Sequence, residues 1–303
     1  MSFDADNIVE RRRLKRRLVF WRVVGIVALV VAVLAGLGRA DLVGHRDHVA
    51  RININGIIFD DQDRNDLLSD IAENTRAKAL IVKINSPGGT YDGGEALYQT
   101  LRQVADKKPI VVVMGATATS AGYMIALASD HIIARASTLT GSIGVIMQTA
   151  DVTGFLEKLG IKPETLKSGP LKAQPNPLER FTPAARKATE DVINDFFDMF
   201  VTLVAERRAM PKEQVLKLSD GRVYSGRQAK KNGLIDAIGS DLEARKWLSD
   251  THKIAESLPI RDVEVTHEDQ PWRDLLGSIV QKVLFSERLS LDGVFSLWHP
   301  ALW

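Results

Sequence analysis

Three short motifs of small residues, each close to an apolar run, constrain this chain more than any other feature. They are Asn-Ser-Pro-Gly-Gly at 85–89, Thr-Ser-Ala-Gly-Tyr at 119–123 and Thr-Gly-Ser-Ile-Gly-Val at 140–145. Two glycines after a buried strand can present a backbone N–H to a negatively charged oxygen. A serine that begins an apolar helix is placed as a nucleophile. The motifs therefore predict a serine-based hydrolytic site.

The body of the chain alternates segments that favour strands with segments that favour helices. Short apolar runs rich in β-branched residues indicate strands that are covered on both faces. Strands are expected at 52–58, 79–84, 110–114, 131–134, 143–147 and 162–166, and helices at 66–77, 93–105, 120–128 and 152–159. This alternation predicts an α/β fold with right-handed crossovers.

A more helical region follows this alternation. Thr182 is a capping hydroxyl with Pro183 at the first helical position, and Ser225 is expected to cap a second, short helix. The sequence shows no internal repeat, so the module that carries the motifs occurs once. We expect an α/β catalytic core at 50–175 and a helical region at 176–250 that completes the same domain.

The N-terminal segment has the composition of a membrane anchor. Residues 1–17 hold six lysines and arginines against three acidic residues, and residues 23–38 carry no charge. As a helix, residues 18–38 span roughly 30 Å, which is the thickness of a bilayer core. Because basic segments stay in the cytoplasm, 18–38 is predicted to be a transmembrane signal anchor with the body outside. A cleaved signal peptide is the alternative.

Composition excludes several kinds of chemistry. The chain has no cysteine, which excludes thiol catalysis, disulfides and cysteine-bound zinc. We expect no metal and no cofactor. The charges of the body nearly balance, so nothing there indicates a nucleic-acid surface. The segment 265–303 is amphipathic and holds three of the five tryptophans, which suits a membrane surface, a partner groove or packing on the body.

A nucleophilic serine needs a base, and Lys172 is the better candidate for it. Of the six histidines, only His131 lies near the motifs, and it opens a predicted strand. A buried lysine can be neutral and accept a proton, and Ser142 is suited to hold its amine by a hydrogen bond. A solvated loop lysine would be the default reading of Lys172 alone. The serine and glycine motifs that precede it make the pattern specific.

These motifs, together with Lys172 and the segment Gly221–Ala229, resemble the signal peptide peptidases. These are bacterial membrane-anchored Ser/Lys proteases of the Clp protease/crotonase fold. The resemblance covers roughly residues 50–240. It implies an α/β fold with repeated ββα units, preceded by one N-terminal transmembrane helix.

The resemblance also implies a role for each site residue. Ser120 would be the nucleophile, Lys172 the general base and Ser142 the residue that holds the lysine. The N–H groups of Gly89 and Ala121 would form the oxyanion hole. Ala121 is a departure, since the family usually has glycine directly after the nucleophile. A backbone N–H still serves there if the φ angle of the alanine is negative.

The function implied is that of a membrane-bound serine endopeptidase. It would hydrolyse remnant signal peptides and other membrane or exported polypeptides, with its catalytic domain on the periplasmic side of the bacterial inner membrane. A homo-oligomer with active sites shared between neighbouring subunits is implied as well.

Three alternatives remain open. A Clp-type protease would have a histidine about 25 residues after the serine, where this chain has none. A crotonase-like hydratase or acyl-transfer enzyme would use the same fold without a Ser/Lys pair. A catalytically inactive membrane scaffold would leave Ser120 unreactive toward a fluorophosphonate.

Overall fold

The computed structural model describes residues 17, 19–31, 46–265 and 295–297. The chain divides into two compact units, Met1–Asp47 and His48–Trp303. In the first unit, residues 19–31 are helical and their side chains are exposed. Within the described residues, no helix combines the length and the apolar character that crossing a bilayer requires. Residue 18 and residues 32–38 of the predicted anchor lie outside the described residues, as does most of the predicted tail.

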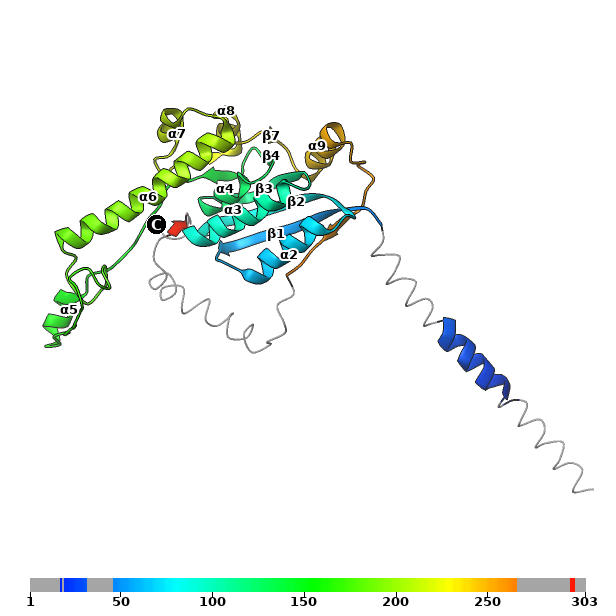
Figure 1. The fold of residues 1–303 in the computed structure, drawn as a ribbon, viewed down its shortest axis with the longest axis horizontal. Coiled ribbons are helices and arrows are strands. Elements are labelled where there is room, and N and C mark those ends of the chain that lie inside the picture. The colour runs from blue at the N-terminus through cyan, green and yellow to red at the C-terminus, as the bar shows by residue number, and fades with distance from the viewer. Residues whose placement is uncertain (1–16, 18, 32–45, 266–294, 298–303) are drawn as a thin grey trace, which may run out of the picture. The chain divides into compact units, whose positions relative to one another are not determined.

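A mixed sheet of nine strands forms the centre of the second unit, counted over the described residues (Figure 1). The strand order is β6-β5-β3-β2-β1-β8, with β4 beside β3, β7 beside β4 and β9 beside β2. All pairs are parallel except β5–β6 and β2–β9. The strands are β1 His48–Ile58, β2 Ala77–Thr90, β3 Ile110–Thr119, β4 His131–Ala134, β5 Leu139–Gly141, β6 Val223–Ser225, β7 Ala237–Ile238, β8 Ile260–Asp262 and β9 Phe295–Leu297. The expected α/β architecture is confirmed.

Helices cover both faces of the central strands. They are α2 Gln62–Glu73, α3 Tyr91–Ala105, α4 Ala121–Ala126, α5 Thr153–Lys158, α6 Pro183–Arg208, α7 Lys212–Leu218, α8 Gly226–Lys231 and α9 Asp241–His252. Residues from α2, α3, α4 and α6 join one buried cluster with the sheet, and residues from α9 join another. Strands β1, β2 and β3 are therefore covered on both sides, as their apolar runs predicted.

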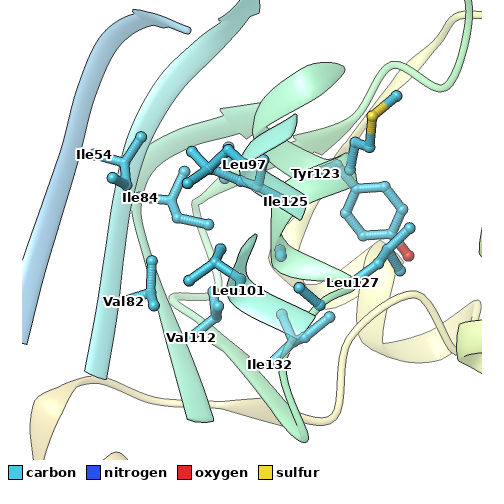
Figure 2. Close-up of a cluster of buried hydrophobic side chains, with 14 of the residues drawn as sticks. Ile54, Val82, Ile84, Leu97, Leu101, Val112, Tyr123, Ile125, Leu127 and Ile132 are labelled. Atoms are coloured by element: carbon cyan, nitrogen blue, oxygen red, sulfur yellow. The ribbon is translucent and has the colours of Figure 1, made fainter. Parts of the chain in front are cut away.

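Alternation along β2 divides its side chains between the two clusters. Val82 and Ile84 pack with Leu97 and Leu101 of α3 on one face (Figure 2). Ile81 points to the opposite face, toward α9. Because successive side chains of a strand point to opposite faces, an unbroken apolar run is needed when both faces are covered.

Strands β2 and β3 are longer than the sequence predicts, and their carboxyl ends carry the glycine and serine motifs. Strand β2 continues through the glycine motif to Thr90. Its register against β3 shifts between Ile84 and Ser86. Beyond the shift, Ser86 pairs with Ala118. The first part of the unit thus runs as single strands alternating with helices. The resemblance implied repeated ββα units with two separate strands each. In the structure, the far ends of β2 and β3 take the place of those second strands, and each is part of one continuous strand.

Some predicted boundaries are wrong. The helix expected at 66–77 begins at Gln62 because the Asp61 side chain accepts a hydrogen bond from the Arg64 N–H and caps it. It ends at Glu73, and β2 begins at Ala77.

Two predicted strands are not strands. Residues 162–166 lie in irregular structure with exposed side chains, since no neighbouring strand pairs with them. The strand expected at 143–147 lies earlier, at Leu139–Gly141, and the chain leaves the sheet after Ser142.

An extended arm links the sheet to the long helix α6. The arm comprises residues 145–182 and includes α5, which lies beside the end of α6 that points away from the sheet (Figure 1). Thr182 caps α6 by accepting a hydrogen bond from the Ala185 N–H at 3.2 Å, and Pro183 is its first residue, as predicted. Lys172 lies on this arm.

Candidate active site

Ser120 occupies a tight turn between β3 and α4. Its φ and ψ angles are 57° and −121°, a conformation that non-glycine residues rarely adopt. Its side chain is buried, with 1% of the residue exposed. Its N–H donates to the Gly141 carbonyl at 2.8 Å, and its own carbonyl accepts from Tyr123 and Met124 at the start of α4. This strand–turn–helix geometry holds a serine at the end of a sheet, as in known nucleophile turns.

Gly89 lies at a position that only glycine can occupy. A Cβ atom built there would be 1.8 Å from the carbonyl oxygen of Ile58 in the neighbouring strand β1. Gly88 has a φ of 120°, and its N–H donates to the Ser86 Oγ at 3.1 Å. Since the Gly88 N–H already has this acceptor, Gly89 is the stronger candidate for binding an oxyanion.

Two contacts join the Gly88–Gly89 end of β2 to the turn that carries Ser120. The Thr119 hydroxyl donates to the Pro87 carbonyl at 2.9 Å. A Cβ on Gly122 would lie 3.2 Å from the Ser86 carbonyl oxygen, so α4 packs directly on the strand. The structure thus brings Gly89 and Ser120 to the same edge of the sheet. Sequence reasoning did not assign the positioning role of Thr119.

The φ angle of Ala121 is compatible with the predicted role of its N–H in the oxyanion hole. Ala121 is the first residue of α4, is fully buried and does not have a positive φ. A Cβ built on Gly94 of α3 would lie 3.0 Å from the Ala121 methyl group, so that methyl already fills the space between the two helices. The Ala121 methyl group fits because Gly94, the residue of α3 that faces it, has no side chain.

Ser142 lies next to the serine turn and is held by strand β6. Gly141 pairs with Thr119 in the sheet, and Ser142 follows it with a φ of 50°. The Ser142 N–H donates to the Arg222 carbonyl at 2.9 Å, and Ser142 is buried. The motif at 221–229 therefore supports Ser142 through β6. It also forms the cap of α8, where Ser225 and Gln228 bond each other reciprocally.

Lys172 is not brought to the other candidate residues. It is exposed on the arm, and its N–H donates to the Gly169 carbonyl at 3.1 Å. Within the part of the chain that the structure describes, its ammonium makes no hydrogen bond or ion pair. Three of the four predicted elements therefore converge, and Lys172, the predicted base, lies on a segment apart from them.

Backbone strain is concentrated at these same residues. Five described non-glycine residues have a positive φ. Two of them, Ala209 and Lys253, are ordinary left-handed ends of helices. The other three are Ser120, Ser142 and Ala173, which directly follows Lys172. Strained backbone of this kind gathers at functional sites, and Ala173 carried no signal in the sequence.

His131 belongs to a different environment. Its ring stacks on Trp247 with centroids 4.8 Å apart, and its Nδ1 lies 4.0 Å from the Asp236 carboxylate. Burial lowers the pKa of His131 and outweighs the nearby carboxylate. Among the described residues, no group of histidines and carboxylates is arranged to hold a metal ion. His131 therefore has a packing role.

An extended segment of the chain lies along the glycine strand. Strand β9 pairs antiparallel with β2, with Leu297 opposite Gly88, Ser296 opposite Gly89 and Phe295 opposite Thr90. The edge of β2 beside the serine turn thus accepts a peptide backbone as an added strand, which is one of the common modes of peptide recognition.

An α/β sheet that presents a strained, buried serine beside a glycine-only strand position has the arrangement of a serine hydrolase. Comparison with known families agrees with this class. A model described as "Peptidase family S49" matches residues 102–255. The chain belongs to this family and is a serine protease.

Several of the similar proteins carry protease or peptidase names. A provisionally named protease of Synechocystis sp. is 35% identical over 204 residues, covering 67% of this chain and 73% of that protein. A protein of Enterococcus faecium, provisionally named signal peptide peptidase SppA, is 34% identical over a matched region that covers 70% of this chain and 66% of that protein. A solved structure of a mutant membrane-bound stomatin-specific protease covers 72% of this chain and 98% of that chain, with 19% identity and a TM-score of 0.46.

Proposed function

We propose that this chain is a membrane-bound endopeptidase with a Ser120/Lys172 dyad, acting on remnant signal peptides and other membrane or exported polypeptides. The observation that carries the proposal is the strained, buried Ser120 beside the glycine-only position of Gly89. Such a turn costs stability and persists where its geometry is used. Membership of a serine peptidase family supports the same reading.

The proposed reaction follows from the placement of these groups. The Ser120 Oγ attacks the carbonyl carbon of the scissile peptide bond while the neutral amine of Lys172 takes its proton. The N–H groups of Gly89 and Ala121 donate to the oxyanion that forms. Lysine returns the proton to the leaving amine, and the peptide C–N bond breaks. Water then hydrolyses the acyl-enzyme by the same route in reverse.

The base would come from a second copy of the chain. The arm that bears Lys172 exposes large apolar side chains to solvent, which is unfavourable in an isolated subunit. They are Phe155, Leu159, Ile161, Leu166, Leu171 and Leu178. Covering this arm by a neighbouring subunit would bury those side chains and exclude water from Lys172. A ring-like homo-oligomer with shared active sites meets both requirements.

The finer features of the proposal concern fold type and location. We assign the sheet to the Clp protease/crotonase fold and residues 18–38 to a single membrane anchor, with the N-terminus cytoplasmic and the catalytic domain extracytoplasmic. The basic segment at 1–17 and the uncharged run at 23–38 support that orientation. An extended peptide at the β2 edge, where β9 pairs, would place its scissile bond near Ser120.

Covalent labelling tests the proposal. The detergent-solubilised full chain is treated with a fluorophosphonate, and hydrolysis of synthetic signal peptides is followed alongside. Labelling of Ser120, absent in Ser120→Ala, together with peptide hydrolysis would support the endopeptidase. Absence of labelling and of hydrolysis in an assembled protein would favour a catalytically inactive scaffold or a hydratase.

A further inference from the structure

Two hydrogen bonds to the carboxylate of Glu179, together called the Glu179 tie, close the loop that carries Lys172. Glu179 Oε2 accepts hydrogen bonds from Lys167 Nζ at 2.5 Å and from Gln174 Nε2 at 2.5 Å. The first donor precedes Lys172 by five residues, and the second follows it by two. The carboxylate therefore connects both sides of the loop.

The tie is shielded, whereas the lysine it brackets is exposed. The side chain of Lys167 is only 12% exposed and that of Glu179 27% exposed. Hydrogen bonds from Lys167, and more weakly from Thr165 and Gln174, lower the pKa of Glu179 despite the opposing effect of desolvation. The carboxylate is thus charged at neutral pH and binds its donors with charge-assisted hydrogen bonds.

The backbone between the two donors is turned tightly. The Lys172 N–H donates to the Gly169 carbonyl and the Gln174 N–H to the Leu171 carbonyl, at 3.1 and 3.3 Å. Ala173, with a φ of 57°, directs the chain from Lys172 back toward the carboxylate. Each of these backbone bonds spans only four residues, so the side-chain hydrogen bonds to Glu179 are what close the wider loop.

The tie is not optimised for stability. Gln174 Oε1 and Glu179 Oε1 are buried and have no hydrogen-bond partner within the described residues. Burying polar atoms in this way costs free energy. Native structures contain few such groups, and each calls for an explanation. Positioning of a functional side chain is one that fits their location on either side of Lys172.

We propose that Glu179 is a positioning residue, which fixes the Lys172 loop through Lys167 and Gln174 so that the amine reaches a serine of another subunit. The inference rests on the proposed role of Lys172 as the base. It also gives Lys167 a role separate from that of Lys172, because the Lys167 ammonium binds Glu179 and helps to hold the loop in place. Displacing a catalytic group by about 1 Å can reduce the rate about 100-fold.

Steady-state kinetics of full-length variants test the proposal. Glu179→Gln removes the charge that binds Lys167, and Lys167→Met removes the main donor. Both should lower kcat by about tenfold or more while KM stays within about twofold, because the lysine acts in the chemical step. Glu179→Asp keeps the carboxylate and should retain more of kcat than Glu179→Gln.

Glu157→Gln is the matched control. Glu157 lies on the same arm, is exposed, and faces Arg180 at 3.7 Å. Surface ion pairs of this kind contribute little, so its kcat should equal that of the unchanged protein. Each variant is also checked for its assembly state and thermal unfolding. If Glu179→Gln fails to assemble, Lys167→Met and Gln174→Ala decide the question.

The outcomes separate this inference from the function on which it rests. An inactive Lys172→Met beside fully active Glu179→Gln and Lys167→Met would overturn the positioning role and leave the dyad standing. Rate losses that only follow a smaller assembled fraction would overturn it too. An active Lys172→Met would remove the dyad itself.

Discussion

Replacing Gly89 with alanine tests the geometry of the oxyanion hole. The new Cβ would lie 1.8 Å from the Ile58 carbonyl oxygen and 2.5 Å from its carbonyl carbon. Close carbon–oxygen contacts in sheets are about 3.3 Å. The strand must therefore move by roughly 1.5 Å. The obstacle is backbone in β1, so no side chain can rotate to relieve the contact.

The size of the effect follows from this displacement. Overpacking costs about 1–3 kcal/mol, and a weakened pairing between Ile58 and Gly89 adds about 1 kcal/mol. We expect Gly89→Ala to lower the free energy of unfolding by about 2–4 kcal/mol. The displaced N–H should lower kcat by about 100-fold or more, which is the effect of losing one oxyanion donor.

Gly154→Ala provides the control. A Cβ at Gly154 meets nothing within 4 Å, and the residue lies in the short helix α5. Its activity and stability should match those of the unchanged chain. Thermal unfolding and initial rates of peptide hydrolysis are measured for both variants. A Gly89→Ala protein with unchanged stability and unchanged kcat would refute the proposed placement of the oxyanion hole.

Other predictions address the base, the core, the edge strand and the anchor. Ser142→Ala should reduce hydrolysis without ending it, because Ser142 orients the base; a kcat equal to that of the unchanged protein would contradict this role. Burial raises the pKa of Asp236, but Arg208 outweighs it and leaves the pKa below its usual value. The pair therefore stabilises the fold above about pH 4 and loses this contribution as pH falls. Asp236→Asn should destabilise the protein by about 2–3 kcal/mol at pH 7 and by less at pH 3, in urea unfolding; an equal loss at both pH values would disprove the linkage. Deleting 295–297 should lower KM for peptides if β9 and substrate share the β2 edge, and an unchanged KM would show that they do not. A phosphatase fused after Asp47 should be active in a bacterial host, and an inactive one would reverse the proposed orientation.

Local patterns predicted the elements that form the site. The apolar run at 131–134 became β4 with the expected bounds, because a strand covered on both faces needs no tertiary information to be recognised. Ser120 was placed correctly at the start of a helix. The requirement for glycine at 89 was expected from chemistry, although the structure adds a second reason, which is the close approach of Ile58.

Other features were outside the reach of local pattern. The apolar residues at 143–147 predicted a strand, yet Ser142 adopts a positive φ that no residue type announced, and the chain turns away. The run at 162–166 is exposed, and no strand among the described residues pairs with it. The tie of Glu179 to Lys167 joins residues twelve positions apart with no periodic signal. Interactions of this range depend on tertiary structure.

Mixing two inactive variants tests the central claim most directly. Ser120→Ala subunits keep Lys172, and Lys172→Met subunits keep Ser120, so each homo-oligomer lacks a complete site. Co-assembled subunits should regain partial peptide hydrolysis, because some interfaces pair an intact serine with an intact lysine. Cross-linking establishes that mixed oligomers have formed. Confirmed mixed oligomers with no activity would contradict a dyad shared between subunits.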